Sequence, residues 1–211
     1  MSSLKLADDE SRSDLTTYVA RARQARPDGA IRLQAVGTTL AAWVGVLDGR
    51  GLLGEGTTIG LRTLALREES TVDVTVPLAA VADRLARADV EPDLDIPPQT
   101  VAAAWAALTP PRTGWQSVTQ VSIEALRSAA SQGIEEITQG APEGSGSAAV
   151  ATLRWRVWTR PLPTSLGAEG LPSSVAFAVH ALGFGVGTVA QVHRAASWHR
   201  VSTPAGFVLA R

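Results

Sequence analysis

Apolar segments with the two-residue period of β-strands lie near both ends of the chain, and the segments between them follow a helical period. In residues 71–76, Val72, Val74 and Val76 alternate with polar residues, which is typical of a strand with one buried face. Because no helical segment separates the N-terminal strands, we expect antiparallel pairing among them. Strands are predicted at 31–36, 40–47, 59–67, 71–76, 189–194, 198–203 and 207–211.

Helical periodicity and capping residues predict a helical middle and one N-terminal helix. Ser13 is the expected cap of the first helix, and Pro77 stands at the first turn of the second. Residues 148–159 also fit a strand, but helix is the preferred interpretation. Helices are predicted at 14–26, 77–88, 97–109, 117–140, 148–159 and 173–182.

Together these patterns predict one α+β domain over residues 1–211. Its antiparallel sheet is formed by the N-terminal strands and a C-terminal hairpin, and four or more helices cover it. The Gly- and Ser-rich residues 140–147 are expected to form a flexible internal loop within this domain.

Composition excludes several classes of function. With 20 acidic and 19 basic residues, the chain has no net field that would attract nucleic acid or an anionic membrane. The absence of cysteine excludes disulfides, thiolate zinc sites and cysteine nucleophiles. The chain shows neither a secretory signal nor an apolar run long enough to span a bilayer. We therefore expect a soluble cytoplasmic protein, and no cofactor is predicted.

Residues 48–60 contain five glycines, four of them before Ile59, and are predicted to be a loop between two strands. The loop lacks the lysine of a P-loop and the following helix of a dinucleotide fingerprint, so a plain hairpin connection is favoured over phosphate binding. Asp48, Glu55 and Arg62 lie around it. They form either a structural ion pair or a site, with Asp48 and Glu55 as catalytic candidates.

The three histidines are the only residues that could serve a histidine-dependent mechanism. His193 and His199 are candidates for a general base. A turn at 195–197 would bring them closer than a single strand would, but no histidine spacing typical of a metal site is present. No metal site is predicted.

Arginine and tryptophan recur together in the second half of the chain. Such pairs can bind an anion, stack on a base or anchor a protein partner, but tryptophan can equally fill the core while arginine reaches solvent. The candidate binding residues are Arg62, Arg112, Trp115, Arg154, Arg156, Trp158 and Arg200.

Two segments, 156–163 and 198–211, resemble uncharacterised proteins of high-GC actinobacteria. The resemblance implies a bacterial cytoplasmic setting and brings no established activity, cofactor or catalytic residue.

Three functions stay open at the level of sequence. The leading hypothesis is a non-enzymatic binding or protein-interaction protein, with self-association as its simplest form. The alternative is an enzyme on a small anionic substrate, in which Arg62 or Arg112 binds the anion and a carboxylate converges with His193 or His199. The third is nucleic-acid binding through the C-terminal hairpin and residues 154–160, which is disfavoured by the charge balance.

Overall fold

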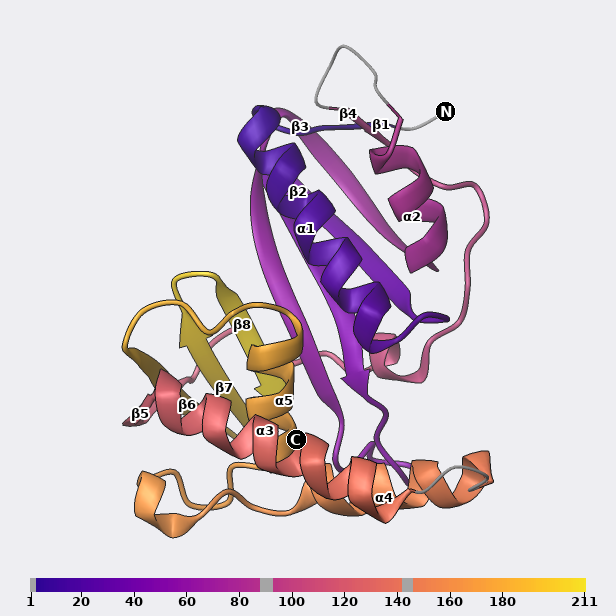
Figure 1. The fold of residues 1–211 in the computed structure, drawn as a ribbon. Coiled ribbons are helices and arrows are strands. Elements are labelled where there is room, and N and C mark those ends of the chain that lie inside the picture. Colours follow the sequence, from indigo (N-terminus) through magenta and orange to yellow (C-terminus); the bar gives the residue numbers. More distant parts are fainter. Residues whose placement is uncertain (1–2, 88–92, 142–145) are drawn as a thin grey trace. The chain divides into compact units, whose positions relative to one another are not determined.

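The computed structural model describes residues 3–87, 93–141 and 146–211 (Figure 1). The chain forms two compact units. The N-terminal unit contains residues 1–46 and 60–109, and the C-terminal unit contains residues 47–59 and 110–211. The expectation of one domain over residues 1–211 stays a prediction.

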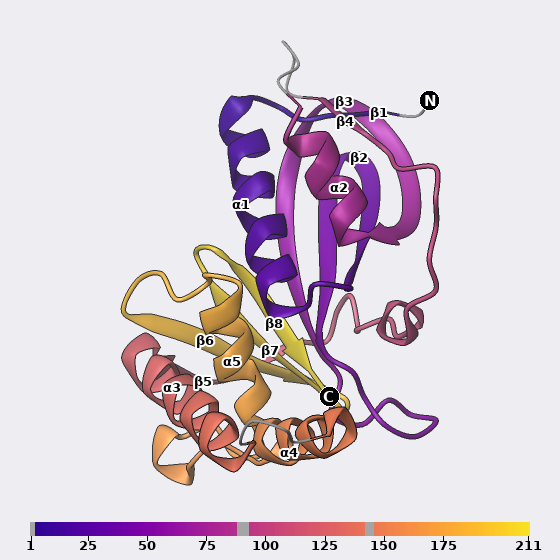
Figure 2. The same ribbon diagram turned by 45° about the vertical axis from the view of Figure 1, so that its right-hand side comes forward.

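The N-terminal unit is built on two long strands, β2 (Ala30–Leu47) and β3 (Thr58–Pro77), which run past its ends into the C-terminal unit. Figures 1 and 2 show helix α1 (Asp9–Ala25) lying along these strands, with the shorter α2 (Leu78–Leu85) beside it. The apolar stripe of α1 is buried, as amphipathic spacing requires. A small second sheet pairs β1 (Ser3–Lys5) with β4 (Asp93–Asp95).

Four antiparallel strands form the sheet of the C-terminal unit: β5 (Gln116–Ser122), β6 (Val189–Ala195), β7 (Trp198–Thr203) and β8 (Gly206–Ala210). Register fixes which side chains share a face. Val192 lies opposite Val201, and Val201 lies opposite Val208; all three are buried. In β5 the register shifts between Ser117 and Thr119, which leaves Val118 in a bulge.

Helices cover the Val192 face of this sheet (Figure 2). Helix α3 (Ile123–Gly140) packs on α5 (Ser173–Ala181), and α4 (Ser147–Thr159) packs on both. Gly133 of α3 leaves room for Trp158 of α4, which is 1% exposed and stacks on Phe177 with 4.7 Å between ring centroids. The core of this unit is therefore filled partly by the arginine- and tryptophan-rich segment.

The hydrogen-bonded order of the larger sheet is β2-β3-β8-β7-β6-β5, and the sheet is not closed. The predicted fold class is confirmed: the described residues form five α-helices, this six-stranded antiparallel sheet and the two-stranded sheet. The C-terminal hairpin completes the sheet as predicted. The helices at 148–159 and 173–182 are also confirmed, each to within a residue.

Three predicted boundaries were wrong. The first helix begins at Asp9, because the Asp8 carboxylate rather than Ser13 caps it and accepts the Ser11 amide at 2.7 Å. Residues 116–122 form β5, and the helix begins only after its cap, Ser122. The four predicted N-terminal strands merge into two. Gly37 adopts a positive φ of 59° without ending β2, and residues 68–70 continue β3 as extended chain.

The predicted helix at 97–109 is replaced by extended chain with one short 3₁₀ turn, η1 (Ala104–Ala107). The Val101 amide donates to the Thr75 carbonyl of β3 at 2.9 Å. This amide is therefore not available for a hydrogen bond within a helix. Trp105 is buried against Gly45, where an added Cβ would lie 2.4 Å from the indole. Tertiary packing overrides the helical spacing here. Of the predicted loop at 140–147, residues 142–145 lie outside the described residues.

Candidate interaction surfaces

The glycine-rich loop is a small hairpin held against α4. Arg50 and Glu55 exchange two backbone hydrogen bonds of 2.8 and 2.9 Å. The Arg50 guanidinium lies 4.1 Å from the centre of the Trp155 ring, a cation–π contact. Gly56, with φ of 80°, fits closely under α4, since a Cβ there would lie 3.0 Å from Thr159. The glycines therefore serve turn geometry and close packing.

The tip of this hairpin exposes two adjacent leucines. Leu52 is fully exposed and Leu53 is 60% exposed. They stand between Gly51 and Gly54, which both have positive φ and turn the chain. Figure 2 shows the loop between β2 and β3 projecting outward. Single exposed apolar residues are common, whereas contiguous exposed apolar surface marks interaction sites. This adjacent pair is therefore a candidate for contact with a protein.

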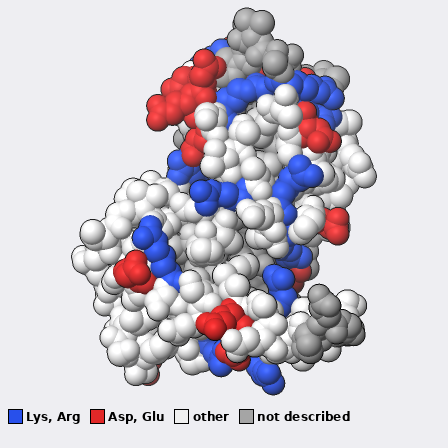
Figure 3. Space-filling view, viewed as in Figure 1, with Lys and Arg blue, Asp and Glu red and all other residues white. Residues whose placement is uncertain are grey.

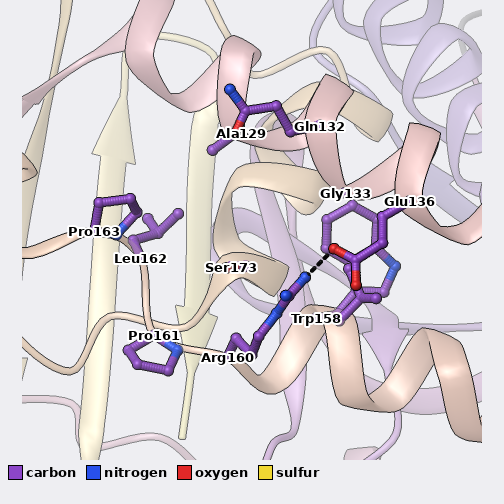
Figure 4. A pocket seen from close by; sticks show the side chains of 11 residues that line it. Ala129, Gln132, Gly133, Glu136, Trp158, Arg160, Pro161, Leu162, Pro163 and Ser173 are labelled. Atoms are coloured by element: carbon purple, nitrogen blue, oxygen red, sulfur yellow. Dashed lines mark hydrogen bonds and ion pairs between the residues drawn. The ribbon is translucent and has the colours of Figure 1, made fainter.

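A pocket of about 280 Å³ opens on the helical side of the C-terminal unit. Figure 4 shows Ala129 and Gln132 of α3 on one wall, and Leu162 and Pro163 from the segment after α4 facing them. The Arg160 guanidinium forms an ion pair with the Glu136 carboxylate at one side of the opening. The pocket is lined by Ala129, Gln132, Gly133, Glu136, Val157, Trp158, Arg160, Pro161, Leu162, Pro163 and Ser173.

The face of the C-terminal sheet away from the helices carries a second arginine–tryptophan group. Arg200 of β7 lies 4.7 Å from the centre of the Trp115 ring and 6.0 Å from that of Phe207. Trp115 is held just before β5, where its indole N–H donates to the Pro111 carbonyl at 2.9 Å. Gly114, with φ of 79°, makes the turn that precedes it. Trp115 and Arg200, both predicted as binding residues, are thus brought together.

His193 of β6 lies directly opposite Arg200 on the same face. Burial, with a smaller effect from the Arg200 charge, lowers the pKa of His193 below 6.5. His199 pairs with Arg194 and faces the other side of the sheet, so the two histidines do not converge. Burial, together with Arg194, also lowers the pKa of His199. No Asp or Glu occurs in β5–β8, so the histidine, arginine and carboxylate required by the enzyme hypothesis do not meet on these strands.

The remaining predicted site residues are dispersed. Arg62 forms an ion pair with Asp14 of α1 at 2.6 Å, within the N-terminal unit. Asp48 and Glu55 are exposed at the two sides of the glycine-rich hairpin. The other predicted arginines are spread over the C-terminal unit: Arg112 and Arg156 are exposed, and Arg154 is half-buried.

Charge is mixed on the face drawn in Figure 3, where basic and acidic side chains are interspersed and much of the C-terminal unit is uncharged. Such a surface does not provide the continuous basic track that nucleic-acid binding uses. Within the described residues, no three His, Asp or Glu side chains are grouped so that they could hold a metal ion. Nor do those residues include a helix that is long and apolar enough to cross a membrane.

The two units largely correspond to two family matches, except that residues 47–59 of the C-terminal unit lie within the first match. A family model described as a domain of unknown function, DUF8010, matches residues 1–107, which is half of the chain. The chain belongs to the DUF8010 family. After that DUF8010 region, a second model, described as domain of unknown function DUF8185, matches residues 110–211. Both models agree with the resemblance to an uncharacterised family, and their boundary falls where the units divide, between residues 109 and 110.

Other comparisons bear on the fold of the DUF8010 protein. No curated protein matches it. Among solved structures, the crystal structure of the DNA polymerase sliding clamp from Caulobacter crescentus is similar, with a TM-score of 0.53 and 11% sequence identity. The similarity covers 95% of this chain, which spans only 63% of the clamp chain. At this identity the likeness concerns the fold.

Sequence reasoning missed three residues of the DUF8010 chain that these surfaces use. Leu52 and Leu53 were treated as part of a plain loop, although an apolar pair between glycines is itself a signal for an exposed tip. Phe207 was assigned to a strand, but only the register of β7 with β8, in which Phe207 pairs with Ser202, places it on the same face as the Arg200 guanidinium.

Proposed function

We propose that this chain is a non-enzymatic binding protein that associates with a second copy of itself through the leucine tip, Leu52 and Leu53. The observation that carries the proposal is the exposure of both side chains on a hairpin that is already held in place by Arg50 and Trp155. Burying a leucine completely stabilises a contact by about 1.5–3 kcal/mol. A preformed hairpin loses little conformational entropy on binding, so more of that free energy is available for association.

The receptor for the tip in this proposal is the α3–α4 pocket of another copy. The tip is convex and apolar, while the pocket is concave and has an apolar wall at Leu162 and Pro163. Different surfaces of the two copies then meet, which makes the contact heterologous and generates a ring or an open chain. The Arg160–Glu136 ion pair at the opening would fix the orientation of the incoming hairpin.

The clamp-like fold supports a binding role over a catalytic one, because the similar protein is described as a clamp for DNA polymerase. The setting we propose is the cytoplasm of a high-GC actinobacterium, as the sequence resemblance implies.

Sedimentation velocity over a range of protein concentrations tests the leucine tip. We expect the unaltered protein to associate in a concentration-dependent way, and the double substitution L52S/L53S to weaken that association at least tenfold. Val36→Ser is the matched control, because it removes an apolar side chain that is 69% exposed elsewhere. An unaltered protein that stays monomeric up to several hundred micromolar would overturn self-association.

Mixing two variants tests the pocket. Ala129→Trp fills the pocket while leaving the tip intact, and L52S/L53S removes the tip while leaving the pocket intact. Each variant alone should be monomeric, whereas an equimolar mixture should form a one-to-one dimer that cannot grow further. If the Ala129→Trp protein associates as well as the unaltered chain, the tip binds elsewhere and the pocket assignment is wrong.

A further inference from the structure

The half-buried Arg200 has no hydrogen-bond acceptor among the described residues, in contrast to Arg32 and Arg62. Arg32 binds the Asp73 carboxylate through two nitrogens, at 2.6 Å each, and Arg62 binds Asp14. The Arg200 guanidinium lies over the rings of Trp115 and Phe207. Its Nε is buried and has no hydrogen-bond partner among the described residues. A guanidinium that has lost water without gaining an acceptor is destabilised, and burial accordingly lowers the pKa of Arg200 below its ordinary value.

Two residues near Arg200 in the sheet also lack hydrogen-bond partners for buried polar atoms within the described residues. His193, its cross-strand partner, and Ser202, two residues along β7, each have a buried polar atom without a hydrogen-bond partner in the described part of the chain. Ser202 and Arg200 lie on the same face, since alternate residues of a strand point the same way. No carboxylate occurs on any of the four strands, so the positive charge of Arg200 is not balanced within the sheet.

The geometry points to an oxyanion-binding site on this face, in which Arg200 binds a phosphate or carboxylate group and His193 lies beside it. Guanidinium presents a planar fork of donors that matches the oxygens of either group. Trp115 and Phe207 hold that fork in one orientation, which reduces the entropy lost when the anion binds. A protonated His193 would add a second positive charge at the same place.

The site can be tested with simple anions and the histidine NMR signals of the full chain. Inorganic phosphate and acetate are titrated separately at constant ionic strength, with chloride as the balancing anion. We expect saturable shifts of the His193 ring signals and a rise of its pKa by at least 0.3 units, whereas the exposed His180 stays unchanged. The stronger of the two titrations identifies phosphate or carboxylate as the preferred group.

Three substitutions separate a site from general charge screening. Arg200→Gln should abolish the saturable His193 shift. Arg194→Gln removes the same charge from the neighbouring cross-strand pair but on the other face, and it should leave the shift intact. Arg200→Lys retains the charge without the fork and should weaken binding several-fold. Equal shifts in the Arg194→Gln and Arg200→Gln proteins, or shifts that do not saturate, would overturn the proposal.

Discussion

At the scale of single residues, the helix packing of the C-terminal unit depends on the absence of one side chain. A Cβ at Gly133 would lie 2.3 Å from Cζ3 and 2.4 Å from Cη2 of Trp158. Trp158 cannot move aside easily, since it is fully buried and stacked on Phe177. Glycine normally weakens a helix interior by about 0.5–1 kcal/mol relative to alanine, and here close packing offsets that cost.

We therefore expect Gly133→Ala to destabilise the protein. Overpacking a filled core costs about 1–3 kcal/mol, and the better helix propensity of alanine returns less than 1 kcal/mol. The net loss in the free energy of unfolding should be about 1–2 kcal/mol, measured by urea denaturation. Ser131→Ala, exposed on the same helix, should change stability by only a few tenths of a kcal/mol. A stabilised Gly133→Ala protein would show that Trp158 has room to shift.

At the scale of elements, β2 and β3 are joined by a charged cross-strand group. Arg32 and Gln34 of β2 both donate to the Asp73 carboxylate of β3. Hydrogen bonding from Arg32, opposed by a smaller effect of burial, holds the pKa of Asp73 below 3.8. A carboxyl group whose pKa falls on folding stabilises the native state above its unfolded pKa and loses this effect as the pH falls through its folded pKa.

Asp73→Asn should accordingly cost stability at neutral pH and lose its effect in acid. The group is partly exposed, so we expect no more than about 0.5–1 kcal/mol at pH 7. Urea denaturation at several pH values should show the difference from the unaltered protein shrinking below pH 3.8. Asp83→Asn, exposed on α2, makes the same charge change away from the strand pair. An Asp73→Asn deficit that persists unchanged in acid would contradict the ionic origin.

The sequence predicted the type of most elements because their periodicity is local. The C-terminal strands and helix α5 were identified from spacing together with turn and capping residues, and helix was preferred for α4 although its spacing also fits a strand. Prediction failed where distant contacts decide the conformation, as at Trp105, which is buried against β2, and at β5, which pairs with a strand some 70 residues away. The candidate site shows the same division, since Arg200, Trp115 and His193 were each noticed but their convergence depends on strand register.

At the scale of the whole molecule, the chain has two compact units while β2 and β3 belong to both. We expect one cooperative unfolding transition, because fraying of either unit would expose part of a strand that the other also uses. Hydrogen exchange during urea titration should show α1 and α3 losing protection at the same urea concentration. Separate midpoints for the two helices would establish two independent domains.

The bulge at Val118 has a consequence for how the protein behaves when concentrated. Strand β5 stands at one end of the hydrogen-bonded order, and no described strand pairs with its outer side. A straight edge of this kind would accept the edge of another molecule and seed fibril growth. Because the extra residue bends β5 and interrupts its ladder, lateral addition of strands is discouraged. Any assembly of this chain in a crowded solution is then steered toward side-chain contacts and away from cross-β aggregation.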